Sequence, residues 1–239
     1  MACGLLITGT DTGVGKTYVA CGIIRVLRER GTRVGAYKPA VTGSRPGPNG
    51  PIWDDAARLQ AALGGEVSPE RICPQRFHAP LAPPVAARQE GRVVDAALLR
   101  RGIEWWNDQA DVMIVEGVGG LLSPLTETET VADVARDFGF PLIVVARLSL
   151  GTINHTLLTL EAARNRRLHV AGIVLSQTVA ADPDDRSIET NAQELRRRCD
   201  VPILANLPHA ASSDLLQHAS LSTIDWMKLA RFGRRHAEL

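Results

Sequence analysis

The sequence predicts a doubly wound α/β fold in which helices cover both faces of a mainly parallel sheet. Two observations support this class. Continuously apolar segments alternate with segments of helical periodicity, which is typical of strands buried on both faces. The first apolar segment also runs into a glycine-rich loop and then into a helical pattern. The expected strands are Leu5–Thr8, Arg33–Tyr37, Val112–Val115, Leu142–Ala146, Val170–Leu175 and Ile203–Ala205.

Helical patterns fill the intervals between these strands. Two proline-rich segments interrupt the alternation: Ser44–Pro51 is expected to be a loop, and Pro80–Pro84 an irregular segment or the start of a helix. The basic segment Lys228–Arg235 is expected to be a solvated helix. The expected helices are Tyr18–Arg30, Asp54–Leu63, Asp95–Gln109, Val131–Phe138, Thr152–Asn165 and Ser187–Cys199.

The length of 239 residues allows one domain or two small ones, and 45% apolar with 22% charged residues is ordinary for a soluble globular protein. We expect a single domain over residues 1–239. The net charge of +1 gives no electrostatic reason to expect nucleic acid as a partner. No apolar run approaches the ~18 residues of a membrane span, and the N-terminus lacks the basic start of a signal peptide. The four cysteines are scattered, as expected for free thiols in the cytoplasm.

The loop over residues 9–17 is the most informative motif. Its sequence, Gly-Thr-Asp-Thr-Gly-Val-Gly-Lys-Thr, lies between an expected strand and an expected helix. Glycines let backbone amides turn around an anion, and the helix dipole favours the same spot. Lys16 would reach the outer phosphates, and the Thr17 hydroxyl would bind Mg²⁺. We therefore expect a P-loop NTPase-like fold, although five residues rather than the usual four separate Gly9 from Gly15.

Polar residues follow three expected strands at the sheet edge where ligands bind. Lys38 could reach a bound phosphate or be a surface lysine. One residue of Asp54–Asp55 would cap a helix, and the other could bind Mg²⁺. Three of the four residues after Glu116 are glycines, and a buried carboxylate there favours a cation partner. Gly151–Thr152 could be an anion site or a plain N-cap. No nucleophile–base set is apparent from spacing.

The chain resembles the dethiobiotin synthetase family over residues 3–208. The phosphate loop has this family's form, including its five-residue gap. Five further motifs match this family, and Gly151–His155 is the most specific of them. The five motifs are Tyr37–Pro39, Asp55–Ala56, Gln89–Gly91, Val115–Gly120 and Gly151–His155.

The resemblance implies a reaction of 7,8-diaminononanoate with CO₂ and ATP, with Mg²⁺ as cofactor. One amine takes up CO₂ as a carbamate, and the γ-phosphoryl group passes to that carbamate. The second amine then closes the cyclic urea of dethiobiotin, an intermediate of biotin synthesis. The absence of a nucleophile agrees with phosphoryl transfer, which depends on positioning and charge neutralisation. The active unit would be a homodimer.

The resemblance also implies residue roles. Lys38 and Lys16 would be catalytic, and Thr17, Asp55 and Glu116 would hold Mg²⁺. Residues implied in nucleotide binding are Gly13, Val14, Gly15, Lys16, Thr17, Tyr18, Asp55, Glu116, Gly117, Val118, Gly119, Ser176, Gln177, Pro208, His209 and Ala210. Residues implied in substrate binding are Thr12, Lys38 and Thr42, with Gly151, Thr152, Ile153 and Asn154 from the neighbouring subunit.

One position departs from the family pattern. Ser176 stands where an asparagine is expected to read the adenine edge, and a hydroxyl cannot replace a bidentate amide. Gln177 could substitute only if the loop shifts, and His209 stands where a tryptophan is expected. We therefore predict weak discrimination among nucleoside triphosphates.

Two alternatives share the loop or the fold. ATPase switches of the ParA and MinD type dimerise on ATP to bind membranes or DNA. They usually carry a second lysine near the loop's start, where this chain has Thr10 or Asp11, and often an amphipathic tail, whereas residues 221–239 have few apolar anchors. Amidase-linked ligases of cofactor synthesis need a glutaminase domain, for which the chain has no room.

Overall fold

Six parallel strands form the central sheet of the computed structural model, which describes residues 2–180, 185–209 and 219–232. The strand order is β2-β5-β1-β6-β7-β8, and each neighbouring pair is parallel. All six expected strands are confirmed, and with them the α/β class. The strands are β1 (Cys3–Gly9), β2 (Val34–Tyr37), β5 (Val112–Gly120), β6 (Leu142–Arg147), β7 (Val170–Ser176) and β8 (Ile203–Leu207).

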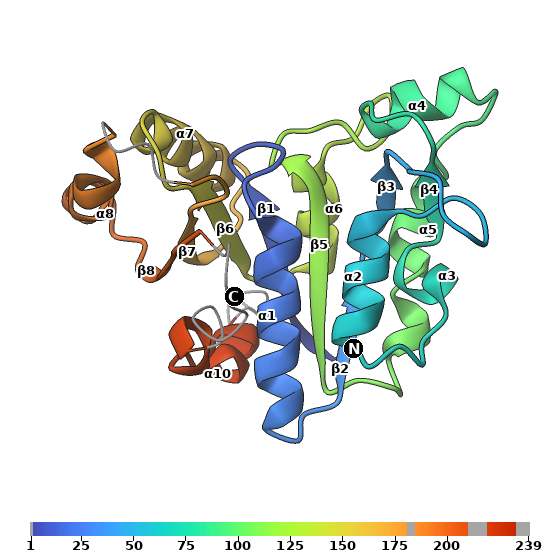
Figure 1. Ribbon diagram of the computed structural model, residues 1–239, viewed down its shortest axis with the longest axis horizontal. Coiled ribbons are helices and arrows are strands. Elements are labelled where there is room, and N and C mark those ends of the chain that lie inside the picture. The colour runs from blue at the N-terminus through green and yellow to red at the C-terminus, as the bar shows by residue number, and fades with distance from the viewer. Residues whose placement is uncertain (1, 181–184, 210–218, 233–239) are drawn as a thin grey trace.

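Helices cover both faces of this sheet (Figure 1). α1 (Lys16–Glu29) packs in front of it beside α2 (Asp54–Ala62), and α6 (Val131–Phe138) lies behind β5. The chain crosses from β1 past β5 to β2, but from β5 past β1 to β6, in the opposite direction. Right-handed crossovers in opposite directions place their helices on opposite faces. The loops after β1, β2 and β5 therefore meet where the strand order reverses, which is where such sheets bind ligands.

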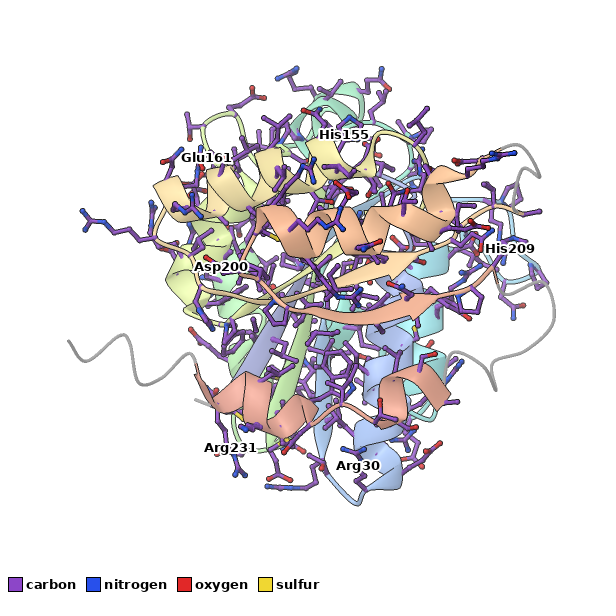
Figure 2. The ribbon with its side chains drawn as sticks, turned by 90° about the vertical axis from the view of Figure 1, so that its left-hand side faces the viewer. Arg30, His155, Glu161, Asp200, His209 and Arg231 are labelled. Carbon is purple, nitrogen blue, oxygen red and sulfur yellow. The ribbon has the colours of Figure 1, made fainter. Side chains whose placement is uncertain are left out.

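The other long helices lie beyond β6. α7 (Thr152–Asn165) and α8 (Ser187–Arg198) pack side by side outside β7 and β8 (Figure 2). Both helices agree with the expected segments within one residue. Among the helices of the described residues, none has the length and apolar character that a membrane span requires.

The helix expected over Asp95–Gln109 is wrong in extent. α5 (Ala96–Arg101) and a 3-10 turn, η1 (Glu104–Trp106), replace it. The Tyr37 hydroxyl lies 3.0 Å from the Leu99 carbonyl oxygen, which a continuing helix would offer to the amide four residues later. A tertiary hydrogen bond from β2 therefore replaces a helical one.

A small second sheet was not predicted. β3 (Ala40–Thr42) and β4 (Gln75–Phe77) pair in parallel. In the chain, β4 follows α3 (Pro69–Ile72) and precedes α4 (Pro83–Gln89), which contacts both strands. Three- and four-residue elements are too short to show periodicity in the sequence. α4 begins inside the proline-rich segment, which agrees with one of the two expected possibilities.

The C-terminal helix is packed rather than solvated. α10 (Trp226–Phe232) contacts β1 and α1, and the Trp226 side chain is fully buried. The Arg30 guanidinium of α1 donates to the carbonyl oxygens of Ile224 and Ser222 just before it (Figure 2). The expected helix is therefore confirmed over residues 228–232, but it is not solvated, because the buried tryptophan just before the basic segment holds it against the core; residues 233–235 lie outside the described residues. The expected loop at 44–51 is confirmed and closes through paired backbone bonds between Arg45 and Ile52.

Candidate active site

The phosphate loop crosses the carboxyl end of β1. Gly13 and Gly15 have φ values of 72° and 98°, in the left-handed region that suits glycine. Gly15 is also the N-cap of α1, and neither a side-chain cap nor an acidic first-turn residue engages the helix start. The first amides of α1 are therefore available to an anion. Lys16 Nζ donates to the Asp11 carbonyl at 2.9 Å and closes the loop on itself.

Strand register brings Lys38 beside Glu116. Tyr37 of β2 pairs with Val115 of β5, so the residue that follows Tyr37 lies next to Glu116. Lys38 Nζ is 2.6 Å from Glu116 Oε1 and 2.9 Å from Asp55 Oδ2. The Lys38 side chain is only 2% exposed. Of the two sequence-based interpretations, the surface lysine is therefore wrong.

Thr17 shares the same two carboxylates. Its Oγ1 lies 2.8 Å from both Asp55 Oδ1 and Glu116 Oε1, although a hydroxyl can donate to only one of them at a time. The second oxygen of Glu116, Oε2, is buried without a hydrogen-bond partner. Four side chains from α1, α2, β5 and the end of β2 thus form one cluster that lacks a donor at this oxygen.

Asp55 enters this cluster from the first turn of α2. The N-cap of that helix is Trp53, so neither aspartate caps it, contrary to expectation. Asp54 turns outward and pairs with Arg45 at 2.8 Å. The two neighbouring acids therefore have different environments, and only Asp55 faces the phosphate loop.

Burial and charge shift the pKa values of these groups. Burial, reinforced by the Lys38 charge and opposed by Glu116, lowers the pKa of Lys16 to about 8. Burial opposes the charge on Lys38, but Glu116 and Asp55 outweigh it and hold the pKa of Lys38 above its ordinary value. Burial raises the pKa of Glu116, whereas Lys38 overcomes burial at Asp55 and lowers its pKa.

The donor set suits Mg²⁺. Thr17, Asp55 and Glu116 offer hard oxygen ligands, and Glu116 Oε2 has a free coordination position. In the described part of the chain, no group of three His, Cys, Asp or Glu side chains could hold a metal ion. Two carboxylates with a hydroxyl are typical of Mg²⁺ sites that are completed by phosphates and water.

A cavity of about 740 Å³ opens above the cluster. Its walls come from the phosphate loop, β3, the start of α4 and the end of β5. Predicted residues that line it are Thr12, Gly13, Gly15, Lys16, Thr17, Tyr18, Lys38, Thr42, Asp55, Glu116, Val118 and Gly119. Val14 and Gly117 lie outside the lining, and Val14 is buried.

The cavity also contains an arginine that the sequence analysis missed. Arg58 lies three residues after Asp55, on the same face of α2. Within the described residues, no hydrogen bond or ion pair engages its guanidinium. The three-residue spacing from Asp55 was the sequence signal that could have identified it.

The residues expected at the base lie outside this cavity. Ser176 is 3% exposed and packs behind the phosphate loop. A Cβ atom added to Gly15 would lie only 2.7 Å from Ser176 Oγ, so the two residues are in close contact. Gln177 Oε1 accepts from the His209 amide at 3.4 Å, one residue after Pro208. These residues gather at the carboxyl ends of β7 and β8. Ala210 lies outside the described residues.

The Gly151–Asn154 segment also lies away from the 740 Å³ cavity. Gly151 is the N-cap of α7, with φ of 92° and no side-chain cap. Thr152 Oγ1 is buried there without a hydrogen-bond partner. A shallower cavity of about 330 Å³ lies beside α7, and His155 and Leu158 line it (Figure 2 labels His155).

Fold and loop together define a nucleotide-binding protein of the P-loop class. A family model described as an AAA domain matches residues 3–215. The ATP-dependent dethiobiotin synthetase of Anaeromyxobacter dehalogenans (strain 2CP-C) is 48% identical over 86% of this chain and 89% of its own. That of Bacillus cereus (strain G9842) is 41% identical over 86% and 83%. The chain belongs to the family of ATP-dependent dethiobiotin synthetases.

Solved structures confirm the fold alone. The septum site-determining protein MinD of Pyrococcus horikoshii, complexed with Mg-ADP, covers 99% of this chain and 98% of its own. Its TM-score is 0.56, but only 17% of the aligned residues are identical. Sequence similarity therefore separates the chain from the MinD-type alternative, with which it shares an architecture.

Proposed function

We propose that this protein is the ATP-dependent ligase that closes the ureido ring of dethiobiotin. Its substrates are 7,8-diaminononanoate, CO₂ and ATP. One observation carries the proposal beyond family membership: two lysines, two carboxylates and a threonine converge on the phosphate loop in a single cavity. Such a site suits phosphoryl transfer, which needs charge neutralisation and positioning more than a covalent residue.

The phosphate loop positions the nucleotide. The amides of Gly13, Val14 and Gly15 bind the phosphates at the start of α1. Lys16 exchanges the Asp11 carbonyl for a phosphate oxygen. Thr17, Asp55 and Glu116 would hold Mg²⁺, which when bound neutralises charge on the phosphate oxygens. Tyr18, Gly117, Val118 and Gly119 complete this side of the site.

Lys38 serves the reacting groups. One amine of the substrate attacks CO₂, loses a proton and becomes a carbamate anion. A carbamate oxygen then attacks the γ-phosphorus, ADP leaves, and a carbamic–phosphoric anhydride remains. The second amine attacks the carbonyl carbon and expels phosphate. Lys38 stabilises the negative charge that these steps concentrate between carbamate and phosphate, while Thr12 and Thr42 contact the diamine.

The substrate carboxylate binds at the start of α7 of a second subunit. No side chain caps this helix start, and although the Thr152 amide donates to the Ser149 carbonyl at 3.3 Å, the amides of Gly151, Ile153 and Asn154 suit an anion. Gly151, Thr152, Ile153 and Asn154 would form this subsite, and they lie outside the 740 Å³ cavity of their own chain. Three exposed leucines, Leu122, Leu150 and Leu158, support a homodimer at this surface. We place the protein in the cytoplasm as one domain over residues 1–239.

Product formation tests this function. The protein is incubated with diaminononanoate, bicarbonate and MgATP, and the mixture is analysed by mass spectrometry. We expect dethiobiotin, ADP and phosphate in equal amounts, and none without the diamine. The Lys38→Met variant controls for contaminating enzymes. ATP hydrolysis that does not depend on the diamine would instead support an ATPase switch and overturn the proposal.

Base selectivity is proposed to be weak. Ser176, Gln177, Pro208, His209 and Ala210 would flank the base, and Ser176 Oγ is buried behind the phosphate loop. Without a bidentate amide, little distinguishes adenine from other bases. Turnover with ATP, GTP and CTP should differ by about tenfold or less, the effect of one lost hydrogen bond. A thousandfold preference for ATP would contradict this proposal.

A further inference from the structure

Lys38 occupies a bridging position between two carboxylates. Its ammonium lies 2.6 Å from Glu116 and 2.9 Å from Asp55, and the side chain is 2% exposed. Glu116 is buried as deeply, with 1% of its side chain exposed. A charge pair buried in this way is strongly coupled because water does not screen it. Lys38 is therefore the counter-ion that these two carboxylates share.

The same carboxylates belong to the proposed metal site. Glu116 Oε1 contacts both Lys38 Nζ and Thr17 Oγ1, and Asp55 likewise contacts both residues through its two oxygens. Mg²⁺ requires near-octahedral oxygen ligands at short range. An ammonium group and a divalent ion cannot share these oxygens without strong mutual repulsion.

Lys38 differs in this respect from the other cavity lysine. Lys16 Nζ donates to a backbone carbonyl, that of Asp11, and not to either carboxylate. Displacing Lys16 therefore leaves the ion pairs of both carboxylates in place, whereas displacing Lys38 breaks both of them. The Lys38 side chain also lines the 740 Å³ cavity, so its flexible four-carbon stem has space to move into.

We infer that Lys38 is an exchangeable counter-ion, whose ammonium group and a divalent metal ion compete for the Asp55–Glu116 pair. Loading the metal with the nucleotide releases the ammonium group toward the phosphates, where the reaction needs it. The inference rests on the proposed metal role of Asp55 and Glu116. It predicts weak metal binding without nucleotide, because Lys38 then holds the ligands.

Metal binding without nucleotide tests the exchange directly. Mn²⁺, a paramagnetic substitute for Mg²⁺, is titrated into the wild type, Lys38→Met and Lys16→Met, and free Mn²⁺ is measured by electron paramagnetic resonance. We expect Lys38→Met to bind at least about tenfold more tightly than the wild type, because a competing charge within about 4 Å is removed. Lys16→Met is the control with the same change in net charge, and its affinity should change less than about threefold.

Thermal unfolding provides a second readout that does not depend on turnover. Lys38→Met leaves buried carboxylates without their counter-ion and should unfold at a lower temperature than the wild type. Millimolar Mg²⁺ should restore much of that loss in Lys38→Met and little of any loss in Lys16→Met. Equal Mn²⁺ affinity in Lys38→Met and the wild type, or equal tightening in both variants, would overturn the exchange.

If Lys38→Met does not fold, the wild type still decides the question. The chain has only three lysines, Lys16, Lys38 and Lys228, so ¹⁵N-lysine labelling gives three side-chain signals. With a non-hydrolysable ATP analogue already bound, adding Mg²⁺ should shift the Lys38 signal and leave that of Lys228 unchanged. An unmoved Lys38 signal would overturn the exchange.

The proposed metal site can fail independently of the exchange. Mn²⁺ should bind to the wild type with the ATP analogue and be lost in Asp55→Asn. If Asp55→Asn retains it, the metal assignment is wrong. If Asp55→Asn loses it but Lys38→Met binds Mn²⁺ no better than the wild type, only the exchange is wrong.

Discussion

The phosphate side of the site and the start of α7 differ in how far a single chain provides partners for their polar groups and covers their apolar side chains. On the phosphate side, Lys16 and Lys38 both have partners, and Asp55 and Glu116 both pair with Lys38, although Glu116 Oε2 is buried without a hydrogen-bond partner. At α7, Thr152 Oγ1 is buried without a partner, and Leu150 and Leu158 are 83% and 60% exposed. The charged side chains of the first region are paired within one chain before any ligand binds, whereas we propose that a second subunit completes the second region.

The largest expected effect concerns the preorganised region. Lys38→Ala and Lys16→Ala should each lower kcat by at least about 10²–10³, because each removes a positive group aimed at developing charge. Single-turnover kinetics of the purified variants measures this, and Lys228→Ala, at an exposed position of α10, is the control. Lys38→Ala should also lose about 3–5 kcal/mol of stability through its unpaired carboxylates. Near-normal rates in both variants would show that the two lysines of the phosphate side do not act in the reaction.

Disrupting the proposed interface tests the other region. Leu158→Glu places a charge on the exposed apolar face of α7 and should yield monomers in sedimentation velocity. Activity should fall at least about tenfold, the effect of losing one central contact, since the carboxylate site would lose its second subunit. Val93→Glu is a matched control, because Val93 is 83% exposed and lines neither cavity described above. A fully active monomer would show that one chain completes both regions.

The lowered pKa of Lys16 predicts a pH dependence confined to the phosphate side. Burial lowers this pKa to about 8, so the unliganded protein loses the Lys16 charge as the pH rises through 8. Bound phosphate favours the charged form, and affinity for ADP should therefore fall by up to about tenfold per pH unit above that value. Isothermal titration between pH 7 and 9 measures the decline. Lys16→Arg should abolish it, because arginine stays charged over this range.

The smallest expected effect concerns Arg58 of α2, which lines the 740 Å³ cavity on the phosphate side. Arg58→Ala should raise KM for ATP by up to about fivefold with little change in kcat, as for a solvent-exposed charge contact. Increasing salt should diminish the difference from the wild type. Arg45→Ala, which removes a neighbouring arginine that lies outside this cavity, should leave KM unchanged. A fall in kcat instead would place Arg58 among the reacting groups.

Sequence reasoning succeeded where local patterns suffice. The six strands are apolar runs, and the loop over residues 9–17 and Glu116 are marked by consecutive residues at strand ends. For Lys38 the sequence left two interpretations open, and only the register of β2 on β5 decided between them. The placement of the phosphate loop and Glu116 at strand ends was thus predictable because each belongs to a continuous motif, whereas that of Lys38 needed the strand register.

The errors arose from contacts between distant segments. The Tyr37 hydroxyl interrupts the helix expected near residue 102, and β1 and α1 bury α10. β3 and β4 are too short to have periodicity of their own. Arg58 has no motif, and only its place in the cavity distinguishes it from other exposed arginines. Each of these features depends on a partner that local sequence does not contain.

The central claim is that the γ-phosphoryl group of ATP passes to the carbamate, and following a carbamate oxygen into the released phosphate tests it most directly. The protein is given ¹⁸O-labelled bicarbonate, diaminononanoate and MgATP, and the released phosphate is analysed by mass spectrometry before the label exchanges with water. If a carbamate oxygen attacks the γ-phosphorus, one ¹⁸O atom appears in phosphate for each dethiobiotin formed. Unlabelled phosphate would mean that water attacks ATP, and would contradict the phosphoryl transfer assigned to Lys38 and Lys16.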